Sequence, residues 1–368
     1  MVLLLFILMA VYVLYWALME YFFYKRETHV PIAEYPFCSV VICAFNEEEN
    51  IQKCLHSILN QQGIERYAEI IVIDDGSQDN TYQEALRTLQ NSAVSHQIYR
   101  YERNMGKKQC IEHAIRMSHP ESTWIILRDA DTWTFSDKWF LQLIGHMSAS
   151  TDFIVAPVVP AIQRYTLTEF FQYYEGLALM HLTYASTVMR HPILCNGANM
   201  AFRKEKFLQL NPYQDNKLLA TGDDIFLLKK MRQNHARIRT VFSSESMVFT
   251  HAPPTFYAII KQKLRWISKT TRVADVFNIL SVLTIILGNS LFIPLAILSW
   301  KLCLIIYFLK LGIDWKILFS VRQRLQIREF SYFYFFIAEL LYIPYVWALI
   351  LGHFSPIHYN DRRNIRTT

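Results

Sequence analysis

Apolar residues are concentrated towards the two ends of this 368-residue chain, on either side of a section in which apolar and polar runs alternate. Val2–Phe23 contains one charged residue, Glu20, and is long enough for a helix of roughly 20 residues that crosses a membrane. Val276–Trp300 carries no charge, and Phe330–Gly352 carries one, at Glu339. The pattern therefore predicts membrane helices before and after a more polar domain.

The basic residues beside these segments predict their orientation. Lys25-Arg26 follow the first span directly, so the positive-inside rule places the next domain in the cytoplasm. Leu302–Phe319 contains charged residues and is a weaker span, so residues 276–352 predict two to three helices. Three crossings would leave the tail, 353–368, outside, whereas its arginines favour the inside. A re-entrant or interfacial apolar segment would remove this conflict, and the sequence leaves the choice open.

In the section between the apolar ends, short apolar runs alternate with amphipathic stretches. Buried strands are predicted at Ser39–Ala44, Glu69–Ile73 and Trp124–Leu127. Apolar residues from Ile51 to Leu59 then fall on one face of a helix, for which Asn46 is the predicted N-cap. This alternation predicts an α/β fold with a mostly parallel sheet, and ligands of such sheets bind at the carboxyl ends of the strands.

The composition fits this mixed architecture. Hydrophobic residues make up 52% of the chain and charged residues 18%, which is too apolar for an ordinary soluble protein and too charged for membrane-spanning helices alone. The net charge is +6, and the excess of bases lies beside the apolar segments, which favours a membrane surface over nucleic acid. The six cysteines show no spacing typical of a metal site or a disulfide framework. We therefore expect a membrane partner and no nucleic-acid partner.

Three acidic signatures follow predicted strands or precede a predicted helix. They are Asp74-Asp75-Gly76-Ser77, Asp129-Ala130-Asp131 and Gly222-Asp223-Asp224. Each signature also has an explanation without catalysis. Asp-Gly-Ser is a common turn, Asp-x-Asp often occurs by chance, and acids at the start of a helix are favoured by its dipole. The carboxylates of Asp129 and Asp131 alternate on an extended segment, so they point the same way and suit one Mg²⁺ or Mn²⁺ ion. His251 is left out of this set, because a lone histidine is more often structural.

Two further segments carry basic residues suited to a diphosphate. Gly106-Lys107-Lys108 opens a predicted helix that runs to about Met117, where Lys107 either neutralises phosphate or is solvated. The sequence has neither a Gly-x-x-x-x-Gly-Lys-Ser/Thr loop nor a Gly-x-Gly turn, which argues against a P-loop ATPase and a dinucleotide-binding turn. Gln262-x-x-Arg265-Trp266 lies on a basic amphipathic stretch, Ile259–Lys269, which is also typical of an interfacial helix.

In this order, with apolar spans on both sides, the three acidic signatures and the Gln-x-x-Arg-Trp signature resemble a membrane-embedded family 2 glycosyltransferase from about Cys38 to Lys269. Gln-x-x-Arg-Trp is the most specific signature and is similar to that of the cellulose, hyaluronan and chitin-oligosaccharide synthase group. The resemblance implies a GT-A fold flanked by transmembrane helices. It also implies an inverting transfer from a nucleotide diphosphate donor, expected to be a UDP-sugar, to a polysaccharide or lipid-linked acceptor, with Mg²⁺ or Mn²⁺ as the cofactor.

The resemblance implies roles for the residues that match the family's motifs. Donor binding is implied for Ala44, Asn46, Glu47, Asp74, Asp75, Lys107 and Asp129. The implied metal ligands are Asp129 and Asp131, and the implied general base is Asp224. Contacts with the acceptor or the diphosphate are implied for Asp223, Gln262, Arg265 and Trp266, and Cys195–Lys204 is expected to border the sugars. Which of Asp74 and Asp75 reads the base is left open. Cys43, Asp223 and Phe226 depart from the pattern, replacing a proline, a glutamate and an aspartate.

The predicted organisation runs from a transmembrane helix at 1–24 to a basic tail at 353–368. Between them lie a cytoplasmic catalytic domain at 36–255, an amphipathic helix at 256–275 and a transmembrane region at 276–352. This describes an integral protein of the bacterial inner membrane. One alternative is a transferase that adds a single sugar to a glycolipid instead of extending a polymer. Another is a catalytically silent assembly or binding protein, although every expected catalytic acid is present.

Overall fold

The computed structural model describes residues 2–25, 32–216, 222–270, 275–290 and 292–354. The chain divides into two compact units, each built from separate stretches. The sheet unit contains residues 27–159 and 190–251, and the helical unit contains residues 1–26, 160–189 and 252–368. Arg26 and the predicted basic tail beyond residue 354 lie outside the described residues.

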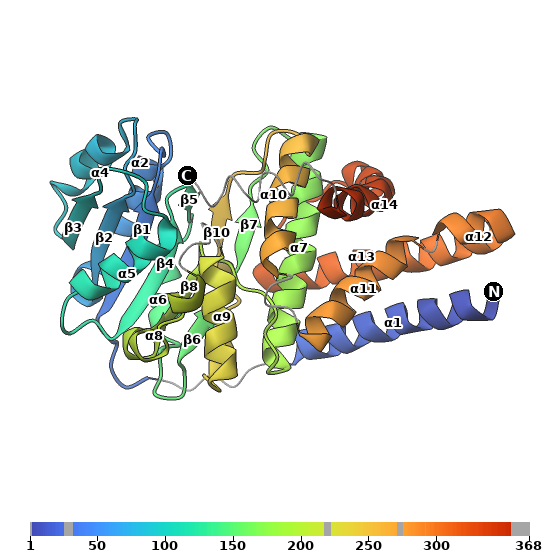
Figure 1. The fold of residues 1–368 in the computed structure, drawn as a ribbon, viewed down its shortest axis with the longest axis horizontal. Helices are drawn as coiled ribbons and strands as arrows, with labels where there is room; N and C mark the ends of the chain where they lie inside the picture. The colour runs from blue at the N-terminus through green and yellow to red at the C-terminus, as the bar shows by residue number, and fades with distance from the viewer. Residues whose placement is uncertain (1, 26–31, 217–221, 271–274, 291, 355–368) are drawn as a thin grey trace. The chain divides into compact units, whose positions relative to one another are not determined.

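A seven-stranded sheet forms the centre of the sheet unit (Figure 1). Its strands are β1 (Cys38–Ala44), β2 (Ala68–Asp74), β3 (Ser95–Arg100), β4 (Trp124–Asp129), β6 (Phe153–Val155), β8 (Met200–Arg203) and β9 (Ile238–Thr240). They are ordered β3-β2-β1-β4-β8-β6-β9, and all neighbours are parallel except β8, which is antiparallel to β4 and β6. The predicted α/β fold with a mostly parallel sheet is therefore confirmed.

The other elements of the sheet unit are helices and a small second sheet. The α-helices are α2 (Ile51–Leu59), α3 (Ile64–Tyr67), α4 (Thr81–Leu89), α5 (Lys107–Met117), α6 (Trp139–Ile144), α8 (Lys204–Leu210) and α9 (Asp223–Gln233). Short 3₁₀ turns lie at Gln214–Asn216 and Ser244–Ser246. The small sheet has the order β5-β10-β7, formed by β5 (Thr132–Trp133), β10 (Val248–Thr250) and β7 (Val158–Pro160).

Both faces of the large sheet are covered by apolar side chains, which explains why its central strands are almost continuously hydrophobic. Val40 and Ile42 face one core together with residues of α2, α4 and α6. Val41, between them, faces a second core together with residues of α5 and α9. The parallel register places Ala44 opposite Asp74 and Cys43 opposite Asp129, so the carboxyl ends of β1, β2 and β4 meet at one edge.

The predicted N-cap at Asn46 is wrong. Helix α2 begins at Ile51, and Asn50 occupies its N-cap position. The backbone between strand and helix forms a separate turn, in which the amides of Asn50 and Ile51 both donate to the carbonyl oxygen of Glu47. Asn46 has a positive φ of 55° and bonds to the loop after β2, so it is engaged elsewhere.

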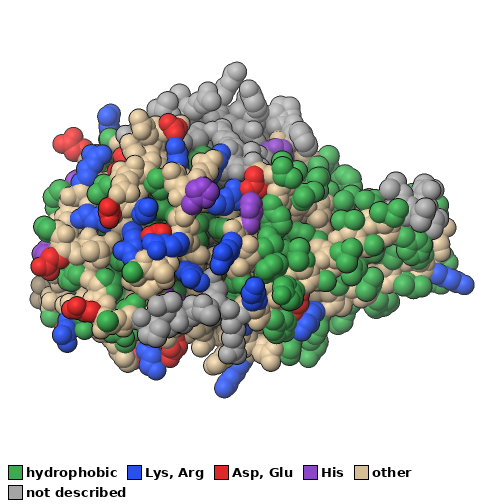
Figure 2. All heavy atoms as spheres, turned by 90° about the horizontal axis from the view of Figure 1, so that it is seen from below, with side chains coloured by type: hydrophobic (Ala, Val, Ile, Leu, Met, Phe, Trp, Pro, Cys, Tyr) green, Lys and Arg blue, Asp and Glu red, His purple; other side chains and the backbone are tan. Residues whose placement is uncertain are grey.

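Long helices make up the helical unit. They are α1 (Val2–Tyr24), α7 (Leu167–Val188), α10 (Phe256–Thr270), α11 (Val276–Ser290), α12 (Phe292–Leu298), α13 (Trp300–Leu325) and α14 (Tyr332–Phe354). Among the described residues, three segments are long and apolar enough to cross a membrane: Phe6–Tyr24, Val276–Leu298 and Tyr332–His353. On the face shown in Figure 2, hydrophobic side chains cover much of the surface formed by this unit. These features indicate a membrane-associated protein.

Helix α7 belongs to the helical unit, although the sequence boundaries placed it inside the domain 36–255. Its aromatic side chains explain this grouping. Phe170 stacks on Tyr334 with ring centroids 4.6 Å apart, and Phe171 contacts Tyr345 at 4.9 Å. The conspicuous run of aromatic residues in α7 therefore packs against α14 and does not fill the core of the sheet unit.

Candidate functional site

The two aspartates at the end of β2 hold the loops around the carboxyl edge. Asp74 is 1% exposed; it accepts a hydrogen bond from the backbone amide of Ser77 and forms an ion pair with Arg100, 3.1 Å away. Asp75 accepts hydrogen bonds from the amides of Met105 and Gly106, which precede α5. Burial raises the pKa of Asp75, and the backbone bonds oppose this effect. Both carboxylates are thus engaged in shaping the loops.

The loop after β1 is braced against the loop after β2. The amide of Asn46 donates to Ser77 Oγ at 2.9 Å, and the side-chain oxygen of Asn46 accepts from the amide of Gln78 at the same distance. The amide of Glu47 donates to Thr81 Oγ1 at 2.7 Å. The predicted donor residues Asn46 and Glu47 therefore lie beside the end of β2, close to Asp74 and Asp75 in the fold.

Lys107 connects two of the acidic signatures. It is the first residue of α5, after Gly106, whose φ of 91° favours glycine. The Lys107 ammonium lies 2.5 Å from Asp129 Oδ1 at the end of β4 and 3.0 Å from Asp223 Oδ2 at the start of α9. Burial lowers the pKa of Lys107, but the two carboxylates outweigh this effect and raise it well above its usual value. Lys107 therefore remains a cation between the two acids.

Gly197 is the closest part of the Cys195–Lys204 stretch to this cluster. A Cβ atom on Gly197 would lie 3.0 Å from Asp223 Oδ2, 3.2 Å from Lys107 Nζ and 3.6 Å from Asp224 Cβ. Asn199 anchors the same loop: it is fully buried and bonds the carbonyl oxygens of Pro157 and Ser246 and the indole of Trp139. The loop is thus fixed at a position where only a hydrogen at residue 197 fits without displacing charged groups. The sequence suggested the stretch but not this residue.

Asp131 lies in an acidic environment. Burial raises the pKa of Asp131 to about 7, and the charges of Asp129 and Glu47 contribute to the increase. Burial also raises the pKa of Glu47, with contributions from Asp129 and Asp79. Three carboxylates therefore repel one another here, which a bound cation would relieve.

Asp129 ends β4, whereas Asp131 lies in the turn that follows, so the two do not alternate along one extended segment as predicted, although their charges interact. Within the described residues, no group of three His, Cys, Asp or Glu side chains is placed to hold a metal ion. Asp129 and Asp131 therefore fit a divalent cation only if other oxygens, such as those of a diphosphate, complete its coordination shell. His251, which the sequence left out of the set, lies against the ring of Trp133, with ring centroids 4.7 Å apart.

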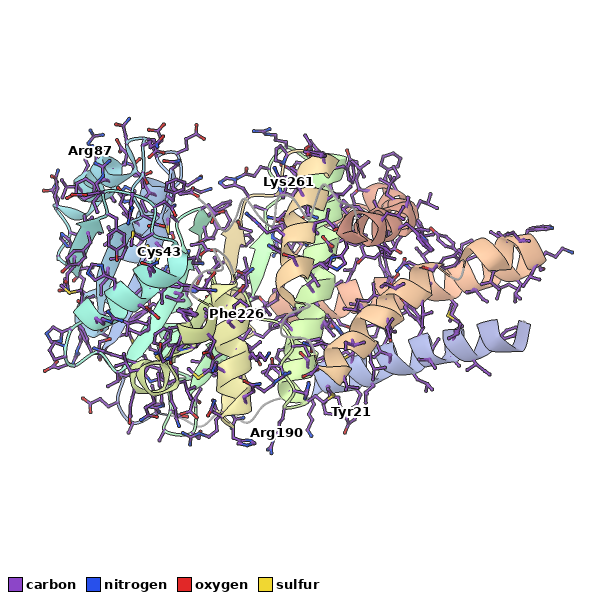
Figure 3. The ribbon with its side chains drawn as sticks, viewed as in Figure 1. Tyr21, Cys43, Arg87, Arg190, Phe226 and Lys261 are labelled. Atoms are coloured by element: carbon purple, nitrogen blue, oxygen red, sulfur yellow. The ribbon has the colours of Figure 1, made fainter. Side chains whose placement is uncertain are left out.

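Figure 3 labels Cys43 and Phe226, two positions where the sequence departs from the resemblance. Cys43 lies on β1 opposite Asp129, and its thiol is 4.0 Å from the carbonyl oxygen of Lys107. Phe226 lies on α9, and the ammonium of Lys108 is 4.5 Å from the centroid of its ring. Both side chains therefore adjoin the start of α5, where the Cys43 thiol faces a carbonyl oxygen and the Phe226 ring faces a lysine ammonium.

Gln262, Arg265 and Trp266 lie on α10 in the helical unit. Lys263, which follows Gln262, forms a buried ion pair with Glu175 of α7, with Lys263 Nζ 2.8 Å from Glu175 Oε2. The same ammonium lies 4.2 Å from the centroid of the Trp266 ring. Glu175 was not predicted, because a single acid in an aromatic helix does not indicate that it pairs with Lys263. The roles of the three predicted residues towards acceptor or diphosphate stay predictions.

Comparisons with known proteins support the resemblance to family 2 glycosyltransferases, although the match does not extend to the Gln-x-x-Arg-Trp signature. Residues 39–210 match the family model for Glycosyl transferase family 2. Glycosyltransferase AglE of Haloferax volcanii is 50% identical over 46 residues, 12% of this chain, and an uncharacterized protein of Methanocaldococcus jannaschii is 32% identical over 93 residues, 25% of this chain. The chain spans only 15% and 38% of the lengths of these two curated relatives.

Among solved structures, the fold is similar to that of mannosyltransferase PcManGT from Pyrobaculum calidifontis, a complex with GDP-Man and Mn²⁺. The TM-score is 0.61 at 14% sequence identity, and the alignment covers 94% of each chain. At this identity the likeness is one of fold, and it agrees with the predicted GT-A architecture. Residues 39–210, slightly less than half of the chain, thus match a glycosyltransferase family 2 domain, and the sheet topology agrees with this match.

Proposed function

We propose that this protein is an inverting glycosyltransferase that moves a sugar from a nucleotide diphosphate donor to a hydroxyl group of a polysaccharide or lipid-linked acceptor at a membrane. The observation that carries the proposal is the pairing of Lys107 with both Asp129 and Asp223, beside Gly197. This cluster brings three separate segments to the carboxyl edge of the sheet, where α/β proteins bind their ligands.

Donor binding is assigned to the loops at this edge. Ala44, Asn46 and Glu47 would line the nucleoside pocket, with Asp74 or Asp75 reading the base. Lys107 would donate a hydrogen bond to a diphosphate oxygen and neutralise its charge. Its ammonium already lies between two carboxylates, and a bound metal cation would offset their charges so that the ammonium can bind the diphosphate as well. Asp129 and Asp131 would hold Mg²⁺ or Mn²⁺, which supplies charge stabilisation for the departing diphosphate.

The transfer step needs a general base for the acceptor. Asp224 is half-exposed at the start of α9, and its carboxylate is the implied base. It takes the proton of the acceptor hydroxyl while the oxygen attacks the anomeric carbon. The bond from that carbon to the diphosphate breaks, and the nucleotide diphosphate leaves with the electron pair. A positioned base of this kind contributes about 10²–10⁴ in rate.

The helical unit supports an acceptor that is located at a membrane. Its three candidate spans would anchor the enzyme, with the catalytic domain in the cytoplasm according to the bases after α1. Gln262, Arg265 and Trp266 would contact the diphosphate or the acceptor from α10. The Gln-x-x-Arg-Trp signature favours a polymer synthase, whereas the small number of spans favours a transferase that adds one sugar to a lipid.

The test is transfer of labelled sugars by the purified protein in lipid vesicles, with a panel of UDP- and GDP-sugars and with Mn²⁺, Mg²⁺ or a chelator. GDP-sugars are included because the mannosyltransferase with the similar fold was solved with GDP-Man. We expect transfer from at least one donor, its loss on chelation, and a fall of at least about 10²-fold in Asp224→Asn. Asp215→Asn, at an exposed acid of the same unit, is the matched control.

The outcome separates the alternatives. Mass spectrometry of the product distinguishes a chain of repeating sugars from a single added sugar. If no donor in the panel is transferred or hydrolysed, and Asp224→Asn behaves like the unchanged protein, the protein is a silent member of the fold and the proposal fails.

A further inference from the structure

Helix α13 runs beside α1 in the same direction. Tyr12 donates to Asp314 Oδ1 at 3.0 Å, Ser320 Oγ donates to Glu20 Oε1 at 2.5 Å, and Arg324 donates to the carbonyl oxygen of Phe23 at 2.6 Å. Residue numbers rise together along both helices, so the two are parallel neighbours. If α1 crosses a membrane, as proposed above, α13 crosses it over the same depth.

The segment formed by α11 and α12, which directly precedes α13, crosses in the opposite direction. Gly288 of α11 lies so close to Tyr12 that a Cβ atom there would collide with its ring. Phe292 of α12 contacts Tyr307 of α13 with ring centroids 5.8 Å apart. Helix α11 therefore packs against α1 and α12 packs against α13, and the chain turns at Ser299 to run back through α13.

The charged residues of α13 lower its mean hydropathy, so composition alone does not identify it as a helix that crosses the membrane. Lys310 is 2% exposed, and its ammonium pairs with Asp314 and, at 2.7 Å, with Glu339. Lys316 bonds Tyr24 at 2.9 Å. Inside a bilayer an unpaired charge is expensive, whereas charges paired within the protein are tolerated. The outer face of α13 carries large exposed apolar residues: Leu304, Ile305, Phe308 and Leu309.

Helix α14 does not follow α13 in this way. In its first half, Tyr332 and Glu339 contact Trp315 and Lys310 of α13. Neighbouring Phe170 and Phe171 of α7 contact Tyr334 and Tyr345, and Gly352 lies against Leu264 of α10. The second half of α14 therefore packs on α7 and α10. Figure 1 shows the same arrangement, because α14 is seen nearly end-on while α1, α12 and α13 are seen along their lengths.

We propose that α14 lies along the membrane, embedded in the leaflet that contains the Lys25 end of α1, and does not cross it. The stretch of α7 that contacts α14 is near that end, since Tyr173 donates to the carbonyl oxygen of Glu329, four residues after α13, at 3.0 Å, and the end of α13 bonds Phe23 through Arg324. The occupant of its outer face is lipid acyl chain, because the exposed side chains there are apolar: Phe333, Phe336, Leu340 and Leu351.

This arrangement removes the conflict in the sequence. After the sheet unit, the chain then crosses the membrane twice, once through the α11–α12 segment and once through α13. The chain after α14 returns to the side of Lys25, where the positive-inside rule places Arg362, Arg363 and Arg366. Length and hydropathy alone favour a crossing by Tyr332–His353. The inference rests on the proposed membrane insertion but not on the catalytic chemistry.

The experiment measures the depth of paired positions in lipid vesicles. A fluorescent amino acid is placed at Leu340 or Leu351, which are exposed and 11 residues apart, and is quenched by lipids brominated at defined acyl positions. A crossing helix would separate these positions by about 16 Å of depth. We expect equal depths. Leu304 and Phe319 on α13, both exposed, are the matched pair, and we expect them to differ by about 22 Å.

A second readout reports the side of the tail. A tag fused after Thr368 should be cleaved by protease only from the side of the vesicle that also gives access to the catalytic domain. Different depths at Leu340 and Leu351, with the tag cleaved from the opposite side, would overturn the inference while leaving glycosyl transfer intact. Equal depths within both pairs would also overturn it, because α13 would then not cross.

Discussion

Lys107 Nζ lies 2.5 Å from Asp129 Oδ1, so the first residue of α5 is ion-paired with the last residue of β4. The same ammonium reaches Asp223 at 3.0 Å. One cation therefore holds together the edge of the parallel sheet and the start of α9. The arrangement makes Lys107 both a support for the cluster and the proposed partner of the donor diphosphate.

Replacing Lys107 by methionine should lower kcat/KM for the donor by about 10²-fold, as expected when a charge-stabilising donor is removed from an active site. Asp129 and Asp223 would also face each other without a cation between them, so the melting temperature should fall. The matched control is Lys230→Met, because Lys230 forms an exposed ion pair with Asp215 in the same unit. Steady-state kinetics that are unchanged in Lys107→Met would contradict the assignment.

Gly197→Ala should reduce transfer with little effect on stability. The new Cβ would lie 3.0 Å from Asp223 Oδ2 and 3.2 Å from Lys107 Nζ, and both are ends of flexible side chains that can move by a few tenths of an ångström. We expect a fall in kcat of about 10-fold, since small displacements of positioned groups slow catalysis strongly. Gly312→Ala is the control, because no described atom beyond the local backbone of its own helix lies within 4 Å of its added Cβ.

Much of the sheet unit was predictable because its signals are local. The strands Ser39–Ala44 and Glu69–Ile73 were predicted within one residue at either end, since their continuous apolar runs reflect burial on both faces. The start of α5 at Lys107 was also predicted, from the glycine before it. The carboxyl-edge location of Asp74, Asp75 and Asp129 then follows from the parallel register.

The rest depends on contacts that no short pattern encodes. Asn46 resembles a helix cap, but its hydrogen bonds to the loop after β2 take it out of that role. The pairing of Lys107 with Asp223 joins residues that are far apart in the sequence. The grouping of α7 with the apolar helices depends on aromatic packing with α14, which its own composition does not reveal.

Mn²⁺ affinity should fall as the pH is lowered through 7. The pKa of Asp131 is raised to about 7 by burial and by Asp129 and Glu47, so below this pH the carboxyl is protonated and cannot bind a cation. We expect a loss of roughly tenfold per pH unit below 7, measured by calorimetric titration of Mn²⁺ in the presence of UDP or GDP. Glu47→Gln should move the transition to lower pH, because one repelling charge is removed. An affinity that is constant from pH 8 to pH 6 would count against Asp131 as a ligand.

Glu175 and Lys263 should behave as a coupled pair that fixes the position of α10. Both side chains are 8% exposed, and Glu175 also accepts hydrogen bonds from Tyr345 and Gln172. Removing one partner of a buried ion pair costs about 3–5 kcal/mol, because the remaining charge is left buried. Lys263→Met and Glu175→Gln should therefore each lower the melting temperature in detergent, and the double variant should lose less than the sum of the two.

The control for this pair is Lys261→Met, because Lys261 is exposed on the same helix, α10 (Figure 3). If α10 contacts the acceptor, Lys263→Met should also raise the KM of the acceptor more than that of the donor, since the ammonium lies 4.2 Å from the ring of Trp266. Additive melting shifts in the double variant would show that the two side chains act independently. An equal rise in both KM values would instead mean that the pair stabilises the protein without orienting Trp266.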